Sequence, residues 1–99
     1  MKRNFKQRGW VTDITYLQIK RSGKRAYLST IIDLETRHWI AYKISYKNNH
    51  KLVMDTLNEA IKKTKDLSGL VLHSDQGFQY LSTEYKIICE SNGIIISHS

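Results

Sequence analysis

The chain has 99 residues, 40% of them hydrophobic, which suits one compact domain and excludes two independently folded ones. Its 16 Lys and Arg residues against 9 Asp and Glu residues give a formal net charge of +7, which favours a polyanionic partner such as nucleic acid. The single cysteine excludes an internal disulfide, and no Cys/His spacing typical of a zinc site occurs, which fits a reducing, cytoplasmic compartment. No apolar run reaches the roughly 18 residues that a membrane-spanning helix needs, so we expect no membrane segment.

Residues 1–9 are basic and polar and have no hydrophobic periodicity, so we expect a flexible arm that leads into a domain spanning residues 10–99. Positions 1–25 hold half of all the basic residues, and Asp13 is the only acidic residue in that range. These basic residues are Lys2, Arg3, Lys6, Arg8, Lys20, Arg21, Lys24 and Arg25. A solubilising basic face is the alternative to a phosphate-binding surface.

Three strands are expected in the first half of the domain. Residues 10–17 are rich in β-favouring side chains and are apolar on both alternating faces, which predicts a central strand covered on both sides. Turns at Gly23 and at residues 33–36 then separate strands over residues 26–32 and 38–45. The three strands together predict an antiparallel meander.

Helices and strands alternate in the second half. Asn48 or Asn49 can cap a helix that ends before Gly69, and residues 70–72 form a short apolar run typical of a buried strand. After a turn-rich stretch at residues 76–80, a second helix is expected from its N-cap Ser82 to Gly93, with a last strand over residues 94–96. The order β-β-β-α-β-α-β predicts an α/β fold with a mixed five-stranded sheet and helices packed on it.

Two acids stand out because of where they lie. Asp13 interrupts an apolar strand, where a carboxylate needs a hydrogen bond, a charged partner or a metal unless it points outward. Asp75 follows the carboxyl end of a short buried strand, where open α/β sheets commonly place functional groups. If these two strands pair in parallel, both carboxylates converge at one end of the sheet and supply the oxygen ligands that Mg²⁺ or Mn²⁺ prefers.

Three ordered blocks of sequence resemble bacterial insertion-sequence transposases of the DDE integrase family. They are WVTDITYL at residues 10–17, LSTIIDL at residues 28–34 followed by Thr36 and Arg37, and LHSDQG at residues 72–77 followed by Gln79 and Tyr80. The resemblance runs from Trp10 to Ser99 and implies a ribonuclease-H-like fold. It also implies that Asp13 and Asp75 are the first two metal-binding catalytic carboxylates, with Asp13 bridging two metal ions and Asp75 holding one.

By the same resemblance, the chain performs metal-dependent DNA cleavage and strand transfer. A third carboxylate, a Glu roughly 35 residues after the second Asp on a further helix, completes the two-metal site in that family. The sequence ends at Ser99, so we expect a core that lacks this C-terminal helix and is inactive when isolated. Glu84 and Glu90 come too early to replace that Glu, and His98 has no assigned role.

DNA at the transposon ends and at the target is the partner that the resemblance implies, with no small-molecule substrate. A homo-oligomer is expected because a sheet without its C-terminal covering helix leaves apolar surface exposed. The expected DNA-contacting residues are Lys20, Arg21, Lys24, Arg25, His73, Gln76, Gly77 and Tyr80. His73 is equally compatible with a structural role, and Tyr80 with packing instead of stacking on a base. Cys89 is expected in the core, and Asp33, Glu35 and Arg37 in turns or surface ion pairs.

Two other functions remain open from the sequence. A nuclease or resolvase with the same fold cuts DNA without joining it. A non-catalytic basic module only binds nucleic acid or oligomerises, but Asp13 is out of place on a phosphate-binding face.

Overall fold

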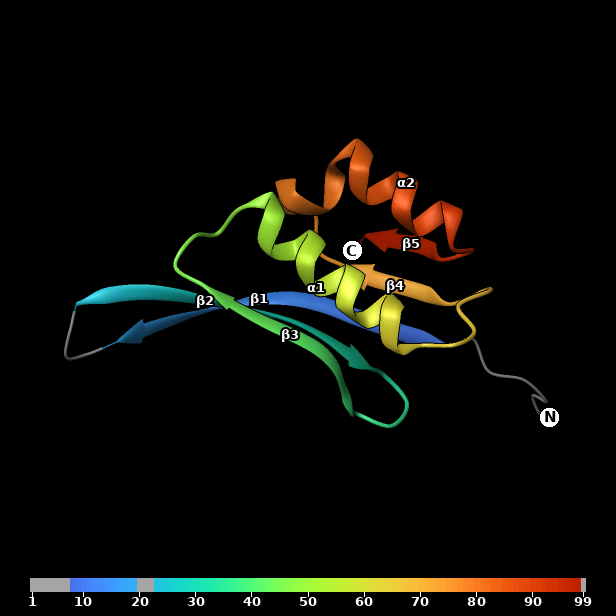
Figure 1. The fold of residues 1–99 in the computed structure, drawn as a ribbon, viewed down its shortest axis with the longest axis horizontal. Coiled ribbons are helices and arrows are strands. Elements are labelled where there is room, and N and C mark those ends of the chain that lie inside the picture. The colour runs from blue at the N-terminus through green and yellow to red at the C-terminus, as the bar shows by residue number, and fades with distance from the viewer. Residues whose placement is uncertain (1–7, 20–22, 99) are drawn as a thin grey trace.

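The structure is a computed structural model that describes residues 8–19 and 23–98. Five strands form one mixed sheet in the order β3-β2-β1-β4-β5 (Figure 1). Their bounds are β1 Gly9–Ile19, β2 Lys24–Asp33, β3 Trp39–Ser45, β4 Val71–Ser74 and β5 Ile95–His98. The antiparallel meander of β1, β2 and β3 is confirmed, and β4 and β5 extend the sheet with parallel pairs.

Two α-helices and one 3-10 helix complete the described part of the chain: α1 His50–Lys63, η1 Phe78–Leu81 and α2 Thr83–Ser91. Asn49 caps α1 by accepting a hydrogen bond from the backbone N–H of Leu52, so of the two candidate caps it is the second that serves. Ser82 caps α2 through the backbone N–H of Tyr85, as expected. Gly93 follows the last turn of α2 with φ 75°, a left-handed conformation that favours glycine.

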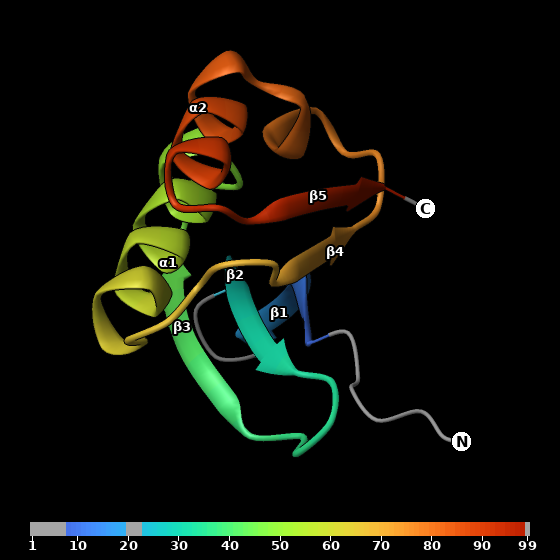
Figure 2. The same cartoon turned by 90° about the vertical axis from the view of Figure 1, so that its right-hand side faces the viewer.

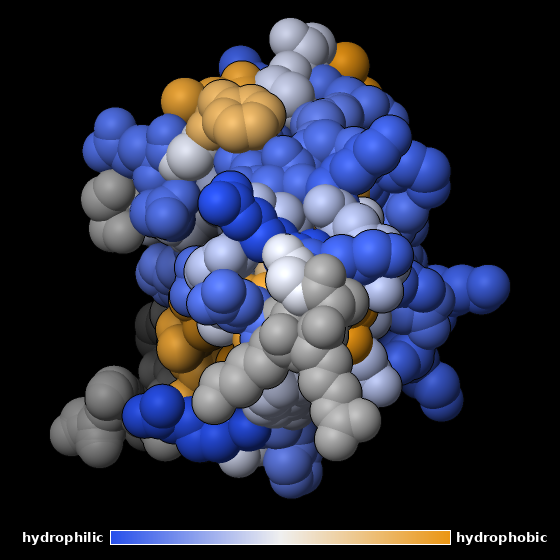
Figure 3. Space-filling view, turned by 90° about the vertical axis from the view of Figure 1, so that its left-hand side faces the viewer, coloured by the Kyte–Doolittle hydropathy of each residue, from blue (hydrophilic) through white to orange (hydrophobic). Residues whose placement is uncertain are grey.

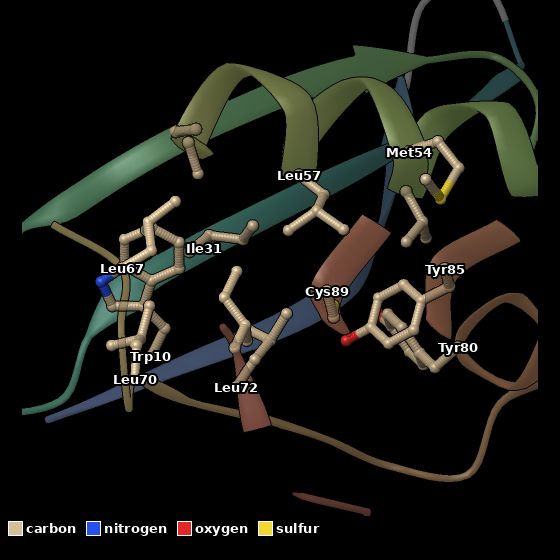
Figure 4. Packing of buried hydrophobic residues seen from close by; sticks show 14 residues of the cluster. Trp10, Ile31, Met54, Leu57, Leu67, Leu70, Leu72, Tyr80, Tyr85 and Cys89 are labelled. Carbon is tan, nitrogen blue, oxygen red and sulfur yellow. The ribbon is translucent and has the colours of Figure 1, made fainter. Parts of the chain in front are cut away.

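The core lies between the sheet and the helices (Figure 4). Trp10 and Leu72 on the two central strands are at most 1% exposed, and Tyr85 and Cys89 on α2 are fully buried. Burial raises the pKa of the Cys89 thiol to about 12, so the thiol remains protonated and packs as a small apolar group. The expected core role of Cys89 is therefore confirmed. No helix in the described ranges is long and apolar enough to cross a membrane.

One prediction about the sheet is wrong: β1 is central but is not covered on both sides. Both helices lie on the same face of the sheet (Figure 2). The paired row Thr12, Ile31 and Ala41 is buried on that face, whereas in the next row Asp13 and Tyr42 are exposed. Within residues 8–19 and 23–98 no helix covers the opposite face, where apolar side chains of the edge strand β3 reach solvent.

Candidate active site

A pocket of about 200 Å³ is lined by residues of β1 and β2, of the segment before α1, and of the loop and 3-10 helix that follow β4. It contains both acids singled out from the sequence. The lining residues are Asp13, Ile14, Tyr16, Tyr27, Asn48, Asp75, Gly77, Gln79 and Tyr80. Segments that are more than 60 positions apart in the chain therefore share one cavity.

The parallel pairing of β1 and β4 explains why the two acids meet. Val11 pairs with His73, and Asp13 and Asp75 each follow two residues later. An equal offset on parallel strands brings the two residues to the same height at the end of the sheet. Because neighbouring strands lie roughly 4.8 Å apart, the backbones at the two positions are close enough for both carboxylates to face one pocket.

Each carboxylate also accepts a local backbone hydrogen bond. Asp13 accepts one from the backbone N–H of Ile14 at 2.9 Å, and Asp75 accepts one from the backbone N–H of Gly77 at 2.8 Å. Both side chains are otherwise exposed to solvent. Each hydrogen bond uses one carboxylate oxygen, Oδ1, so the second oxygen of each residue remains available to a ligand in the pocket.

The loop after Asp75 is held close to the pocket by Gly77 and Gln79. A Cβ atom on Gly77 would lie 3.0 Å from the side-chain oxygen of Gln79 and 3.1 Å from Oδ1 of Asp75, so a larger residue would crowd both. Gln79 is buried and donates a hydrogen bond from its side-chain amide to Oδ1 of Asn48. Asn48 thereby connects the loop that carries Asp75 to the segment preceding α1.

His98, which has no role assigned from the sequence, contacts the residue that precedes Asp75. Its Nδ1 lies 3.0 Å from the hydroxyl of the buried Ser74, and that hydroxyl donates a hydrogen bond to the backbone carbonyl of Asp75. Ser74 and His98 are also paired between β4 and β5. The end of β5 therefore supports the backbone at Asp75, a contact between strands that the sequence alone does not reveal.

Tyr80 forms the inner wall of the pocket. It is only 3% exposed, and its ring packs edge-on against Tyr85 with centroids 5.8 Å apart (Figure 4). Burial raises the pKa of its phenol to about 12, and the negative charges of Asp13 and Asp75 add to this shift. A ring packed in this way has no open face for a nucleobase, so the Tyr80 ring packs in the core and does not stack on a base.

The remaining residues expected at the site are distributed over several positions. Lys20 and Arg21 lie outside the described residues. The Arg25 guanidinium lies over the ring of Tyr16 and the Lys24 ammonium over the ring of Tyr46, while Gln76 is exposed in the loop after Asp75. His73 is half-buried near Gly9 and does not line the pocket.

The donor set of the pocket fits a hard divalent cation. Two carboxylates with free oxygens are the ligands that Mg²⁺ and Mn²⁺ prefer, and these ions commonly keep several waters in addition. The part of the chain that the structure describes contains no cluster of three His, Cys, Asp or Glu residues able to hold a metal ion. The described residues thus offer two protein ligands to such an ion.

Five pocket residues were not among those singled out for chemistry from the sequence: Ile14, Tyr16, Tyr27, Asn48 and Gln79. Tyr16 and Tyr27 meet only because β1 and β2 pair at that register, and Asn48 meets Gln79 across 31 positions. Ile14, Tyr16 and Gln79 lie in blocks that carry the family resemblance. No local sequence pattern distinguishes Tyr27 and Asn48 from ordinary strand and cap residues.

Comparison with known proteins gives a family match over almost the whole chain. Residues 5–99 match the family described as "Integrase core domain". A protein of Escherichia coli K12, "Putative transposase InsK for insertion sequence element IS150", is 39% identical over 85 residues, which cover 86% of this chain and 29% of that protein. The "Transposase for insertion sequence element IS904" of Lactococcus lactis is 35% identical over 77 residues, covering 78% of this chain and 30% of the relative.

The fold is shared with viral integrases. A structure of the HTLV-2 integrase catalytic core domain in complex with magnesium, in a trimeric form, matches with a TM-score of 0.76 at 20% identity. The match covers 99% of this chain and 63% of that one. A simian T-cell lymphotropic virus intasome in complex with a PP2A regulatory subunit contains a chain that matches with a TM-score of 0.77 at 19% identity, over 94% of this chain and 32% of that one. The present chain spans about 30% of the length of the two transposases.

Proposed function

This chain belongs to the integrase core domain family, and from this premise we propose that its pocket is the catalytic site for metal-dependent DNA cleavage and strand transfer in transposition. The observation that carries the proposal is the presence of Asp13 and Asp75 in one pocket at matching positions on parallel strands. Residues 10–99 form the catalytic core in this proposal. Of the expected basic arm at residues 1–9, residues 1–7 lie outside the described part of the chain, and Gly9 belongs to β1.

In the proposed site, Asp13 and Asp75 would hold Mg²⁺ or Mn²⁺ through their free carboxylate oxygens. A cation bound there supplies Lewis-acid stabilisation of the charge that develops on the phosphoryl group. Gly77 allows the loop to approach the pocket closely, and Gln79 and Ser74 hold the backbone on either side of Asp75. These contacts keep the two carboxylates in place without a rearrangement at the moment of reaction.

DNA is the proposed substrate, and the basic residues near the pocket would hold its phosphates. Lys24 and Arg25 lie on the hairpin whose neighbouring residues line the pocket. Lys20, Arg21 and Gln76 are proposed as further DNA contacts, although Lys20 and Arg21 lie outside the described residues. His73 is proposed at most as a peripheral contact, because it does not line the pocket. A nuclease that cuts without joining uses the same carboxylates, and product analysis for joined strands distinguishes it.

Salt dependence tests the DNA part of the proposal. Affinity for duplex DNA in EDTA should fall as salt rises, and replacing both Lys24 and Arg25 with Gln should reduce the slope of log K against log salt by about 2, roughly 0.9 per lost phosphate contact. The matched control replaces Lys62 and Lys65, at and just beyond the far end of α1, and should leave the slope unchanged. Salt-independent binding, or equal effects of the two double variants, would contradict the proposed path.

A second copy of the chain is the proposed cover for the open face of the sheet. Trp39, Tyr42 and Ile44 on β3 are 54%, 56% and 60% exposed, and large apolar side chains exposed together usually mark an association surface. Neighbours of the same fold occur in dimeric and trimeric forms. We expect light scattering at high micromolar concentration to give a dimer or larger species, and Tyr42→Lys with Ile44→Lys to shift it to a monomer of 11.6 kDa. A wild-type monomer at that concentration would refute this part.

A further inference from the structure

We propose that Tyr16, supported by Tyr27 and Arg25, is a stacking platform for an unpaired DNA base next to the carboxylate pocket. The inference rests on the proposed function and adds to it the kind of DNA that the site receives, namely a strand whose end is not paired. The platform is a binding feature separate from the two carboxylates.

Tyr16 and Tyr27 are placed at the pocket by the pairing of β1 with β2. The two residues lie directly opposite each other, with ring centroids 5.7 Å apart and ring planes tilted by 48°. Both line the same pocket as Asp13, which lies three residues before Tyr16 on β1. At roughly 3.3 Å per residue, the aromatic pair begins about 10 Å from Asp13 along the strand.

The exposure of Tyr16 is unusual for an aromatic residue that lines a pocket. It is 48% exposed, whereas Tyr80 on the inner wall of the same pocket is 3% exposed. The hairpin around Tyr16 projects away from the helices (Figure 1), so packing against the core does not explain the ring. Figure 3 views this end of the molecule, where the described surface is mostly hydrophilic. A flat ring open to solvent beside a polar pocket suits a nucleobase, since stacking on aromatic side chains accepts any base.

Arg25 adds a positive charge to the same platform. Its guanidinium carbon lies 5.9 Å from the centroid of the Tyr16 ring, and among the residues that the structure describes no carboxylate lies within ion-pair distance of it. A guanidinium beside an aromatic ring can remain in contact with the ring while its N–H groups face a phosphate. A nucleotide carries both a flat base and a phosphate, and it therefore matches both groups of the platform.

Other exposed aromatic pairs do not share these features. The rings of Trp39 and Tyr42 are 5.9 Å apart and similarly exposed, but neither residue lines the pocket. The Tyr46 ring lies under Lys24 and is likewise absent from the pocket lining. The combination of ring, cation and carboxylate pocket is found at Tyr16 among the described aromatic residues. Phe78, which is 67% exposed and does not line the pocket, therefore serves as the aromatic control.

The test measures affinity of the full 99-residue chain for a fluorescent single-stranded oligothymidylate of about 16 nucleotides, in EDTA so that no cleavage occurs. We expect Tyr16→Leu to weaken binding about tenfold, in the range found for loss of one base stack, and Tyr16→Phe to bind as the wild type does. Phe78→Leu should leave the affinity unchanged. Arg25→Gln should instead reduce the salt slope by about 0.7, because it removes a phosphate contact.

An abasic oligonucleotide of the same length separates base stacking from charge. It should bind the wild type as weakly as the normal strand binds Tyr16→Leu, and Tyr16→Leu should cause no further loss. Equal affinities of the wild type for the two strands would overturn the platform, even if Tyr16→Leu failed to fold.

DNA binding that does not depend on Tyr16 would reject the platform alone. If the chain bound neither single-stranded nor double-stranded DNA, the proposed function would be rejected as well. Equal losses for Tyr16→Leu and Phe78→Leu would point to a general effect and reject the platform too.

Discussion

Appending a helix that carries a Glu roughly 35 residues beyond Asp75 is expected to turn an inactive 99-residue chain into one that nicks DNA with Mn²⁺. The described residues offer two carboxylates to the pocket, and a pair of metal ions that clamps the attacking and leaving oxygens needs more ligands than these. Since charge on the phosphoryl group must be stabilised in the transition state, we expect the gain to be at least about a thousandfold.

The same extension with Gln in place of Glu is the control for this prediction. The amide keeps the shape and the helical preference of the side chain but lacks its charge, so activity should remain at background. A supercoiled-plasmid nicking assay compares the two extensions, the 99-residue chain and the Glu extension with Asp13→Asn. A labelled oligonucleotide with a free 3′-hydroxyl reports joining in the same reaction. Nicking by residues 1–99 that Asp13→Asn abolishes would show that no third carboxylate is needed, and equal activity of Glu and Gln extensions would remove its proposed role.

The second large effect is on thermal stability with and without metal. In EDTA the carboxylates of Asp13 and Asp75 repel each other, so Asp13→Asn or Asp75→Asn should raise the melting temperature by roughly 2–4 °C. Asn retains the Oδ1 that accepts the hydrogen bond from Ile14 or Gly77, so the local structure is preserved. With Mn²⁺ at 100 times its dissociation constant, the wild type should gain about 2.7 kcal/mol, or roughly 10–20 °C, and both variants should lose this gain.

Asp66→Asn is the matched control for the melting curves. Asp66 accepts a hydrogen bond from the backbone N–H two residues later, as Asp75 does, but it does not line the pocket. Its variant should respond to Mn²⁺ as the wild type does. If Asp13→Asn and Asp75→Asn both lose stability in EDTA and still respond to Mn²⁺, the two carboxylates do not share a cation.

The sequence was sufficient to predict the strands, the helices and the two acids, because these depend on local patterns. Asp13 is an acid within an apolar strand and Asp75 follows a short buried strand, and both signals can be read within a few residues. The cap at Asn49 and the buried face of α2 follow from the same local rules. The convergence of the two acids depended on an assumed parallel pairing of their strands, which the structure shows between β1 and β4.

The rest of the site depends on contacts between distant residues. Asn48 meets Gln79, Ser74 meets His98 and Tyr16 meets Tyr27 only after the strands have paired. The apolar residues on both faces of β1 predicted cover on both sides, yet the described helices all pack on one face. The apolar residues of a strand indicate that it is buried, but they do not specify which element or which copy of the chain covers it.

A crystal structure of the chain with Mn²⁺, with data collected for anomalous scattering by manganese, would show whether the two carboxylates hold a cation. We expect an anomalous peak in the pocket within about 2.6 Å of a carboxylate oxygen of both Asp13 and Asp75, either as one shared ion or as a close pair. Carboxylates more than about 10 Å apart, or a manganese peak bound only elsewhere on the chain, would contradict the assignment of this pocket as the catalytic site.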